Sequence, residues 1–273
     1  PFHGWLPDTM ETPTPVSAFM HAGIINAGGF LVVRLSPLFV HAPLALYALA
    51  VLGTITAAFG AIVMLAQPSV KRSLAFSTIA QMGFMLLQCG LGAFGLALLH
   101  IVAHSLYKAH AFLHAGSTIS AVPRAAIKLP IFALSIGLLA GGLLVAGAAT
   151  AWSIFLPSPL HQGGVFTVVL ALALAYGLAR AWAAGGGIRI AMISTLAAAG
   201  MAAASFALHF AASIFYKDLP DFEPPHALVV IVITVFASLF VFQSFLWRAA
   251  SHPIGRSLYV HALNGFYIGT LGN

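Results

Sequence analysis

The sequence predicts an all-α, polytopic bundle of transmembrane helices, and three observations lead to this fold class. Of the 273 residues, 61% are apolar and only 6% are charged, whereas an ordinary soluble domain carries about a quarter charged residues. The mean hydropathy is +1.02. Apolar stretches of about 20 residues, the length needed to cross a membrane, recur between short polar segments. These features exclude a cytosolic enzyme, a nucleic-acid binder and a disordered protein.

The charges and the Gly- and Pro-rich clusters divide the chain into eight expected helices. The apolar residues 15–247 are predicted to form the membrane bundle, after a polar, proline-rich and irregular lead-in over residues 1–14. Residues 248–273 are amphipathic and are expected to form a tail outside the bilayer. The chain starts at Pro1 with no signal peptide, so we expect a piece of a longer protein. The eight helices are expected at about residues 15–34, 43–66, 73–91, 93–116, 130–152, 164–182, 188–212 and 226–247.

Basic residues between the expected helices predict the orientation in the membrane. One side of the bundle carries eight basic residues and the other carries two, Arg34 and Lys217. Cytoplasmic loops are rich in Lys and Arg, so the first side is predicted to be cytoplasmic. We therefore expect a multi-pass inner-membrane protein with both ends of this chain in the cytoplasm. The eight residues are Lys71, Arg72, Arg124, Lys128, Arg180, Arg189, Arg248 and Arg256.

Lys108 is the basic residue that falls in the middle of an expected span. His100, His104 and Lys108 have the spacing i, i+4, i+8 and share one helical stripe. A charge at mid-membrane costs about 3 kcal/mol on insertion scales, and it persists where it faces protein or water. Histidine exchanges protons near neutral pH. The row predicts a proton relay; the alternative is two hydrogen-bonded core histidines and a lysine that extends to the membrane surface.

Two further groups of polar residues lie in neighbouring helices. His21 follows Pro15 in the first expected helix and is either a core residue or a relay residue. Ser73, Ser77 and Gln81 form a second i, i+4, i+8 stripe in the helix that precedes the His–His–Lys row. Ser77 and Gln81 are candidates for a hydrated path; ordinary hydrogen bonding between helices is the alternative.

Cofactor and metal motifs are missing from the sequence. The HxxxHxxxK row has no glutamate of the HExxH kind, which argues against a zinc site. Cys89 is the single cysteine, which excludes a disulfide framework and an iron–sulfur site. No quinone, flavin or NAD motif is present. We therefore expect a transporter subunit without a cofactor, rather than an enzyme, whose own partners are the lipid bilayer and protons or Na+.

Long motifs in the first 120 residues resemble the antiporter-like membrane subunits of respiratory complex I and of Mrp antiporters. The segment PFHGWLPDTMETPTPVSAFMHAG resembles the stretch in which PTPVSA enters a helix with a histidine. VKRSLAFSTIAQMGFMLLQCGLGAFGLALLHIVAHSLYKAHAFLHAGS resembles the next shared block. The resemblance implies a helix bundle with inverted repeats and a polar axis for proton translocation. It places Lys108 at the central channel lysine, His100 and His104 at the channel histidines, and His21 at the histidine after PTPVSA.

Within that superfamily, HAGIINAGGFLVVRLSPL, HIVAHSLYKAHAFL and SLYVHALNGFYIGTLGN are similar to the DabB-type membrane subunits of inorganic-carbon pumps. The resemblance implies an ion-conducting subunit that couples an ion gradient to uptake of CO2 as bicarbonate. Its partner would be a peripheral DabA-like zinc subunit related to carbonic anhydrase.

The alternative is an antiporter-like subunit of an NADH:quinone oxidoreductase, a membrane hydrogenase or an Mrp antiporter. Those subunits carry a further lysine or glutamate in a later broken helix. Residues 130–212 contain only Arg180 and Arg189 as charged residues, both at helix ends. This departure favours the carbon-pump interpretation.

Overall fold

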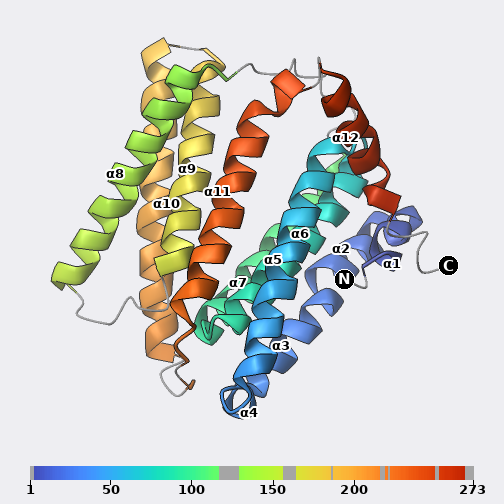
Figure 1. Ribbon diagram of the computed structural model, residues 1–273, viewed down its shortest axis with the longest axis vertical. Helices are drawn as coiled ribbons and strands as arrows, with labels where there is room; N and C mark the ends of the chain where they lie inside the picture. The colour runs from blue at the N-terminus through green and yellow to red at the C-terminus, as the bar shows by residue number, and fades with distance from the viewer. Residues whose placement is uncertain are drawn as a thin grey trace. The chain divides into compact units, whose positions relative to one another are not determined.

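The structure, a computed structural model, describes residues 3–116, 129–155, 164–185, 187–215, 219–220, 222–249 and 252–267, and every regular element in these ranges is a helix (Figure 1). The long helices are α5 (Pro43–Ala66), α6 (Val70–Gly90), α7 (Phe94–Leu113), α8 (Ile131–Phe155), α9 (Gly164–Ala183), α10 (Gly187–Phe215) and α11 (His226–Ala249). The shorter ones are α1 (Trp5–Asp8), η1 (Thr9–Glu11), α2 (Thr14–Ala22), η2 (Ile24–Asn26), α3 (Ala27–Arg34), α4 (Ser36–Phe39) and α12 (Pro253–Leu263). The predicted all-α fold class is confirmed.

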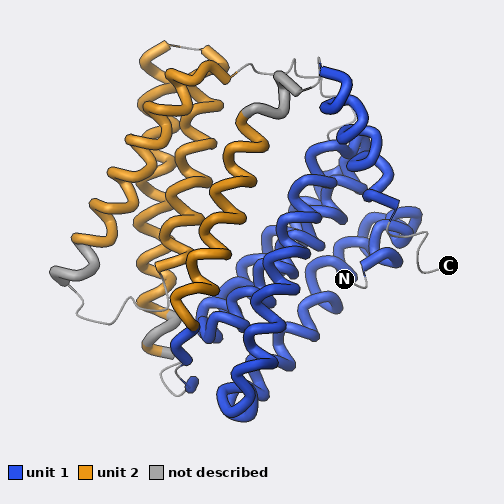
Figure 2. The backbone as a smooth tube through the Cα atoms, viewed as in Figure 1, with its two compact units in different colours: residues 1–123, 218–224, 249–273 blue, residues 124–217, 225–248 orange. Residues whose placement is uncertain are grey.

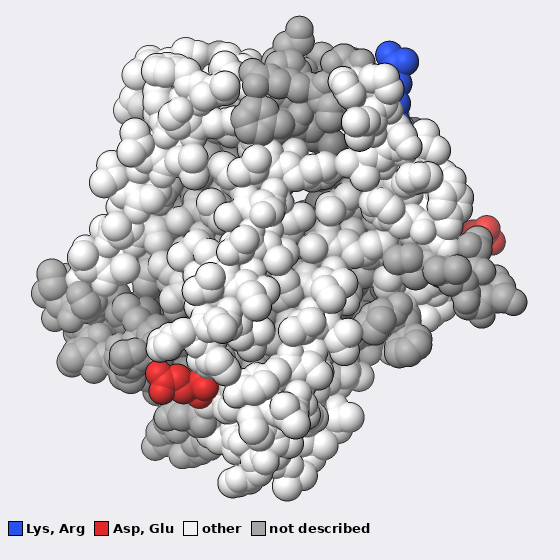
Figure 3. All heavy atoms as spheres, in the orientation of Figure 1, with Lys and Arg blue, Asp and Glu red and all other residues white. Residues whose placement is uncertain are grey.

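The helices have the length and composition of membrane spans. Seven helical segments of the described chain are long and apolar enough to cross a bilayer, with α2 to α3 counted as one. Helix α6 also has 21 residues, but it is less apolar because it carries Lys71, Arg72 and several amides and hydroxyls. Figure 3 shows few acidic or basic side chains on the described part of the viewed face, as expected for a surface that meets lipid.

The chain divides into two compact units (Figure 2). Unit 1 consists of residues 1–123, 218–224 and 249–273, and it contains α1 to α7 and α12. Unit 2 consists of residues 124–217 and 225–248, with α8 to α11. The residues 15–247 that the sequence predicts as one bundle are therefore distributed over both units. Three residues of the charge count, Arg124, Lys128 and Lys217, lie outside the described residues.

The first expected helix is interrupted, and the expectation of one continuous helix over residues 15–34 is corrected here. Helix α2 begins at Thr14 with Pro15 in its first turn, where a proline is tolerated, and it ends at Ala22. The 3-10 turn η2 follows, and α3 continues to Arg34. The lead-in is also more regular than expected, since it forms the short helices α1 and η1.

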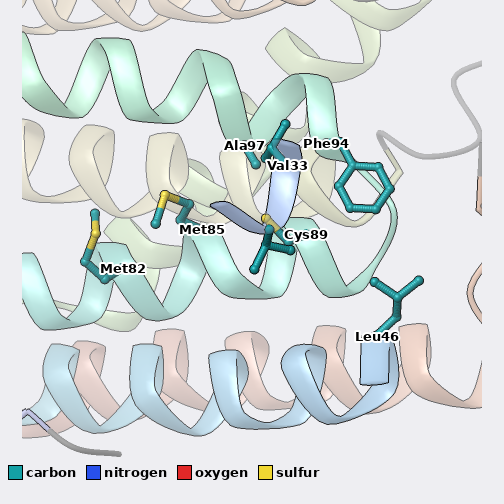
Figure 4. Packing of buried hydrophobic residues seen from close by; sticks show 8 residues of the cluster. Val33, Leu46, Met82, Met85, Cys89, Phe94 and Ala97 are labelled. Carbon is teal, nitrogen blue, oxygen red and sulfur yellow. The ribbon is translucent and has the colours of Figure 1, made fainter. Parts of the chain in front are cut away.

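Helices α5 and α6 pack closely through small residues. A Cβ atom placed on Gly53 would lie 2.5 Å from the backbone nitrogen of Leu87, and one on Gly83 would lie 2.4 Å from that of Ala57. Small residues allow such close approach of membrane helices. The core on the other face of α6 contains Met82, Met85 and Cys89; Figure 4 shows them with the side chains that surround them, among which are Val33, Leu46, Phe94 and Ala97.

Unit 2 repeats this packing on a smaller scale. On α8, a Cβ atom added to Gly137 would lie 2.5 Å from the carbonyl oxygen of Ala175 on α9. Around this contact, α9 contributes Leu174 and Leu178 to an apolar core that also includes Val145 and residues of α10. Helix α11 adds Phe240 to a second core cluster.

The tail of unit 1 packs back onto the helix ends. The Nε2 atom of Gln67 donates to the carbonyl oxygen of Leu263 at 3.1 Å. Gly265, Phe266 and Tyr267 then adopt left-handed conformations, with φ of 60°, 52° and 58°. Such a conformation is costly for residues with a side chain, and here it directs the Phe266 ring toward Phe59, at 6.1 Å between ring centroids.

Candidate functional site

The site is built on helix α7, which presents His100, His104 and Lys108 along one stripe. Lys108 is completely buried and His104 is 3% exposed, so the predicted stripe faces protein and not lipid. The Nζ atom of Lys108 donates to Ser77 Oγ at 2.8 Å and to the carbonyl oxygen of Leu74 at 3.1 Å. Both acceptors are neutral, and an ammonium group has a third donor beyond these two bonds.

Helix α6 faces this stripe because α6 and α7 form an antiparallel pair. A short turn between Gly90 and Phe94 joins them, and Gly92 in this turn has a φ of +77°, which glycine adopts without strain. Ser77 on α6 therefore lies opposite Lys108 on α7. Gln81, one helical turn after Ser77, reaches the ring of His100.

His100 is held at both ring nitrogens by amide side chains. Its Nδ1 atom lies 2.9 Å from Gln88 Oε1, and its Nε2 atom lies 3.0 Å from Gln81 Oε1. Gln88 is 6% exposed. The two glutamines are two helical turns apart on α6, and the imidazole lies between them.

His104 differs from His100 in this respect. Neither ring nitrogen of His104 has a hydrogen-bond partner among the described residues, although both are buried. Its ring lies edge-on to that of His100, with 5.9 Å between the centroids. Buried polar atoms are nearly always hydrogen-bonded, so the two ring nitrogens of His104 are an unusual feature of this site.

His21 joins the site from helix α2. It is fully buried and stacks on Phe112, one turn beyond Lys108 on α7, with 4.6 Å between the ring centroids. Both of its ring nitrogens also lack a partner among the described residues. His21, His104 and Lys108 are close enough for their charges to interact.

The interruption after α2 is tied to α7 by Asn26. Its Nδ2 atom donates to the carbonyl oxygen of Ala22 at 2.7 Å and to Ser105 Oγ at 3.0 Å. Ser105 in turn donates to the carbonyl oxygen of Ile101 within α7. This chain of bonds fixes the end of α2, and with it His21, against the helix that carries Lys108.

The structure brings the sequence-predicted residues together in unit 1. Lys108 bonds to Ser77, His100 bonds to Gln81, and the rings of His100 and His104 are neighbours. Ser73, the other member of the polar stripe on α6, makes a long bond of 3.4 Å to the carbonyl oxygen of Met64.

Three contributors were not among the predicted site residues: Gln88, Asn26 and Ser105. The signal for Gln88 was its spacing of seven residues from Gln81, which places both on one face of a helix. Asn26 and Ser105 become neighbours through the path of the interrupted helix, which depends on backbone geometry. His110 and His114 form a separate exposed stack, with ring centroids 4.2 Å apart.

Chemically, the site is a row of proton-exchanging groups in an apolar setting. An imidazole can accept a proton at one nitrogen and release one at the other. Lys108 donates hydrogen bonds to neutral oxygens, so these bonds do not require the amine to stay charged as a bond to a carboxylate would. Such a row can pass protons between neighbouring groups, with polar hydroxyl and amide side chains from α6 along one side.

Comparison with known proteins gives a consistent result. Residues 1–128 match the family described as NADH:quinone oxidoreductase/Mrp antiporter, TM. The chain is 39% identical over 98% of its length to the protein named "Probable inorganic carbon transporter subunit DabB2" of Halothiobacillus neapolitanus, of which it covers 50%. It is 37% identical over 85% of its length to a DabB of the same description from Bacillus subtilis, of which it covers 46%.

A third similarity is confined to the first part of the chain. Over 44% of its length the chain is 49% identical to the chloroplastic NAD(P)H-quinone oxidoreductase subunit 5 of Poa pratensis, of which it covers 17%. The chain spans about half the length of the two inorganic carbon transporter subunits that it matches over most of its length. The resemblance inferred from the sequence motifs is confirmed by these matches.

Proposed function

We propose, from the premise that this chain belongs to the antiporter-like superfamily of membrane subunits, that it conducts protons in an energy-coupled inorganic-carbon pump. Lys108 is the central relay group in this proposal, with His104, His100 and His21 as its neighbours. Ser77 and Gln81 border the path that water would fill. The single observation that carries the proposal is a completely buried lysine held by two neutral oxygens, with His104 one turn before it on the same stripe of α7.

The extent of similarity supports the carbon pump over the alternative. The match to the oxidoreductase subunit covers 44% of the chain, whereas two of the matches to inorganic carbon transporter subunits extend over 85% and 98%. The sequence similarity to these two subunits therefore extends into unit 2. The alternative function, proton translocation in an NADH:quinone oxidoreductase, a membrane hydrogenase or an Mrp antiporter, is supported by the first 120 residues alone.

The partner and the orientation belong to the same proposal. The chain would work with a peripheral DabA-like zinc subunit, which performs the conversion of CO2 to bicarbonate while the membrane subunit supplies the ion gradient. The excess of basic residues on one side supports an inner-membrane location with both chain ends in the cytoplasm. The exposed side chains of α12, such as Ile254, Tyr259 and Val260, would then be available to a cytoplasmic partner.

The test is Lys108→Met in the full-length subunit, expressed with its peripheral partner in a host that needs CO2 uptake to grow in air. Methionine keeps the apolar volume of the side chain and removes the proton-exchanging group. We expect no growth in air, normal growth in elevated CO2 and an unchanged amount of subunit in the membrane. Lys108→Arg should also fail, because arginine does not release its proton.

Lys71→Met is the matched control for this experiment. Lys71 donates to the carbonyl oxygen of Thr12 at 3.2 Å, at the N-terminal end of α6 and away from the histidine row. We expect this variant to support growth in air. Growth of the Lys108→Met variant in air would rule out the relay, and loss of NADH-driven proton pumping without loss of bicarbonate uptake would favour the alternative function.

A further inference from the structure

The arrangement around His100 sets it apart from the other histidines of the site. Both of its ring nitrogens have amide partners at 2.9 and 3.0 Å, while both ring nitrogens of His104 and of His21 have none among the described residues. Phe84, on the turn of α6 between the two glutamines, lies 5.8 Å from the His100 ring between centroids. The His100 ring is thus bordered on three sides by one helix.

Proton counting shows what the two amides can do. A neutral imidazole has one N–H donor and one bare nitrogen that accepts, whereas the charged ring has two donors. A glutamine amide presents an oxygen acceptor or an NH2 donor, and a half-turn of the amide exchanges them. With both oxygens toward the ring, the pair matches the charged form. With one amide turned, it matches either neutral tautomer, depending on which glutamine has turned.

From this geometry we infer that Gln81 and Gln88 form an amide clamp that holds His100 in a fixed place and hydrogen-bonds every protonation state of its ring. Gln88 is a positioning residue of the relay in this inference, which rests on the proposed function. The clamp consists of Gln81 at Nε2 and Gln88 at Nδ1. When the protonation state of His100 changes, rotation of a glutamine side-chain amide is the only movement needed to keep both ring nitrogens hydrogen-bonded.

The clamp also gives His100 a direction. Gln81 lies one turn from Ser77, the partner of Lys108, so the Nε2 side of the ring faces along α6 toward the lysine. Gln88 lies two turns further on, near the end of α6 at Gly90. A proton from a neighbouring relay group enters at the bare nitrogen as the amide there turns from donor to acceptor. The proton on the opposite nitrogen then passes to the next group as that amide turns to donate, so the ring returns to the other neutral tautomer. The orientations of the two amides therefore determine which ring nitrogen of His100 accepts the incoming proton.

The test compares Gln88→Met with Gln81→Met by 15N NMR of histidine-labelled full-length complex. The chain has 12 histidines, so the His100 signals are identified by their loss in a His100→Phe variant. In Gln88→Met the remaining partner is at Nε2, and in Gln81→Met it is at Nδ1. A buried N–H without a partner is costly, so the proton should move to the partnered nitrogen by a ratio of about ten or more.

We therefore expect opposite tautomers in the two variants: Nε2–H in Gln88→Met and Nδ1–H in Gln81→Met. Gln243→Met, on α11 in unit 2, is the matched control and should leave the His100 signals unchanged. The same tautomer in both clamp variants, or wild-type signals in both, would overturn the clamp. Restoring an amide with Gln88→Asn should return part of the second tautomer, which a purely structural role of residue 88 would not require.

Transport measurements separate this inference from the proposed function. If Lys108→Met abolishes bicarbonate uptake while the NMR signals of the clamp variants are unchanged, only the clamp fails. If the clamp variants show opposite tautomers while Lys108→Met retains uptake, the proton relay fails and the clamp remains as a structural device. Where both hold, Gln88→Met should lower the uptake rate by about tenfold, in line with the tautomer ratio.

Discussion

A close contact between the backbones of α5 and α6 makes Gly83→Ala a strict test of how α6 is positioned. A Cβ atom at residue 83 would lie 2.4 Å from the backbone nitrogen of Ala57 and 2.8 Å from the carbonyl oxygen of Gly53. Ordinary van der Waals contacts of such atoms begin at 3.4 Å. The backbones of α5 and α6 must therefore separate by about 1 Å at this point, since neither of the blocking atoms belongs to a flexible side chain.

This displacement would be transmitted to the site because α6 carries three of its residues. Ser77, Gln81 and Gln88 make bonds of 2.8 to 3.0 Å to α7. A shift of about 1 Å is enough to break or compress such bonds, whose useful range is about 2.7 to 3.2 Å. Overpacking of this kind costs about 1–3 kcal/mol of stability. We expect a lower unfolding temperature in detergent together with a loss of bicarbonate uptake.

Gly28→Ala is the matched control for this change. Gly28 lies in α3 with no atom within 4 Å of an added Cβ. Alanine favours a helix over glycine by about 1 kcal/mol, so this variant should unfold at the same temperature as the wild type or slightly higher. Equal unfolding temperatures and equal uptake for Gly83→Ala and Gly28→Ala would refute the close approach of α5 and α6.

Two further predictions concern contacts at the edges of the site. Asn26→Leu removes the buried hydrogen bonds to Ala22 and Ser105, so we expect a loss of about 1–3 kcal/mol of unfolding free energy, measured by denaturation in detergent. An unchanged stability would show that the interrupted helix is fixed by other contacts. Phe266→Ala removes the ring that holds the tail on Phe59, and we expect faster proteolytic cleavage within α12. Tyr259→Ala is the control, because the Tyr259 side chain is 49% exposed. Equal cleavage of both variants would contradict the role of Phe266 as an anchor of the tail.

The helices could be predicted from sequence because their signals are local. Apolar stretches separated by Pro, Gly and charged residues define each helix within its own segment, and Pro43 begins α5 as expected of a proline in a first turn. The interruption after α2 was missed because residues 15–34 read as one apolar stretch. Gly23 ends α2 with φ of −112° and ψ of −78°, and this backbone geometry has no strong signature in composition.

The stripe on α7 could also be predicted, but its hydrogen bonds could not be assigned from that stripe alone. Spacing places His100, His104 and Lys108 on one face, and the energetic cost of a buried lysine indicates which face is inside. Their partners depend on the register between α6 and α7, which the short turn at Gly92 sets. Reflecting the chain about this turn places His100 opposite Phe84, between the two glutamines, as observed.

The choice of neutral partners for Lys108 connects the fold to the proposed function. A carboxylate in the place of Ser77 would hold the ammonium group by charge, and breaking a buried ion pair costs about 3–5 kcal/mol. A hydroxyl and a backbone carbonyl hydrogen-bond the charged amine and the neutral amine alike, because the charged form has three N–H groups to donate and the neutral form still has two. The cost of moving a proton onto or away from Lys108 is then set by its burial and not by a fixed counter-ion. A lysine that serves only to anchor a helix has no need of this arrangement, whereas a lysine that is charged and discharged in every cycle does.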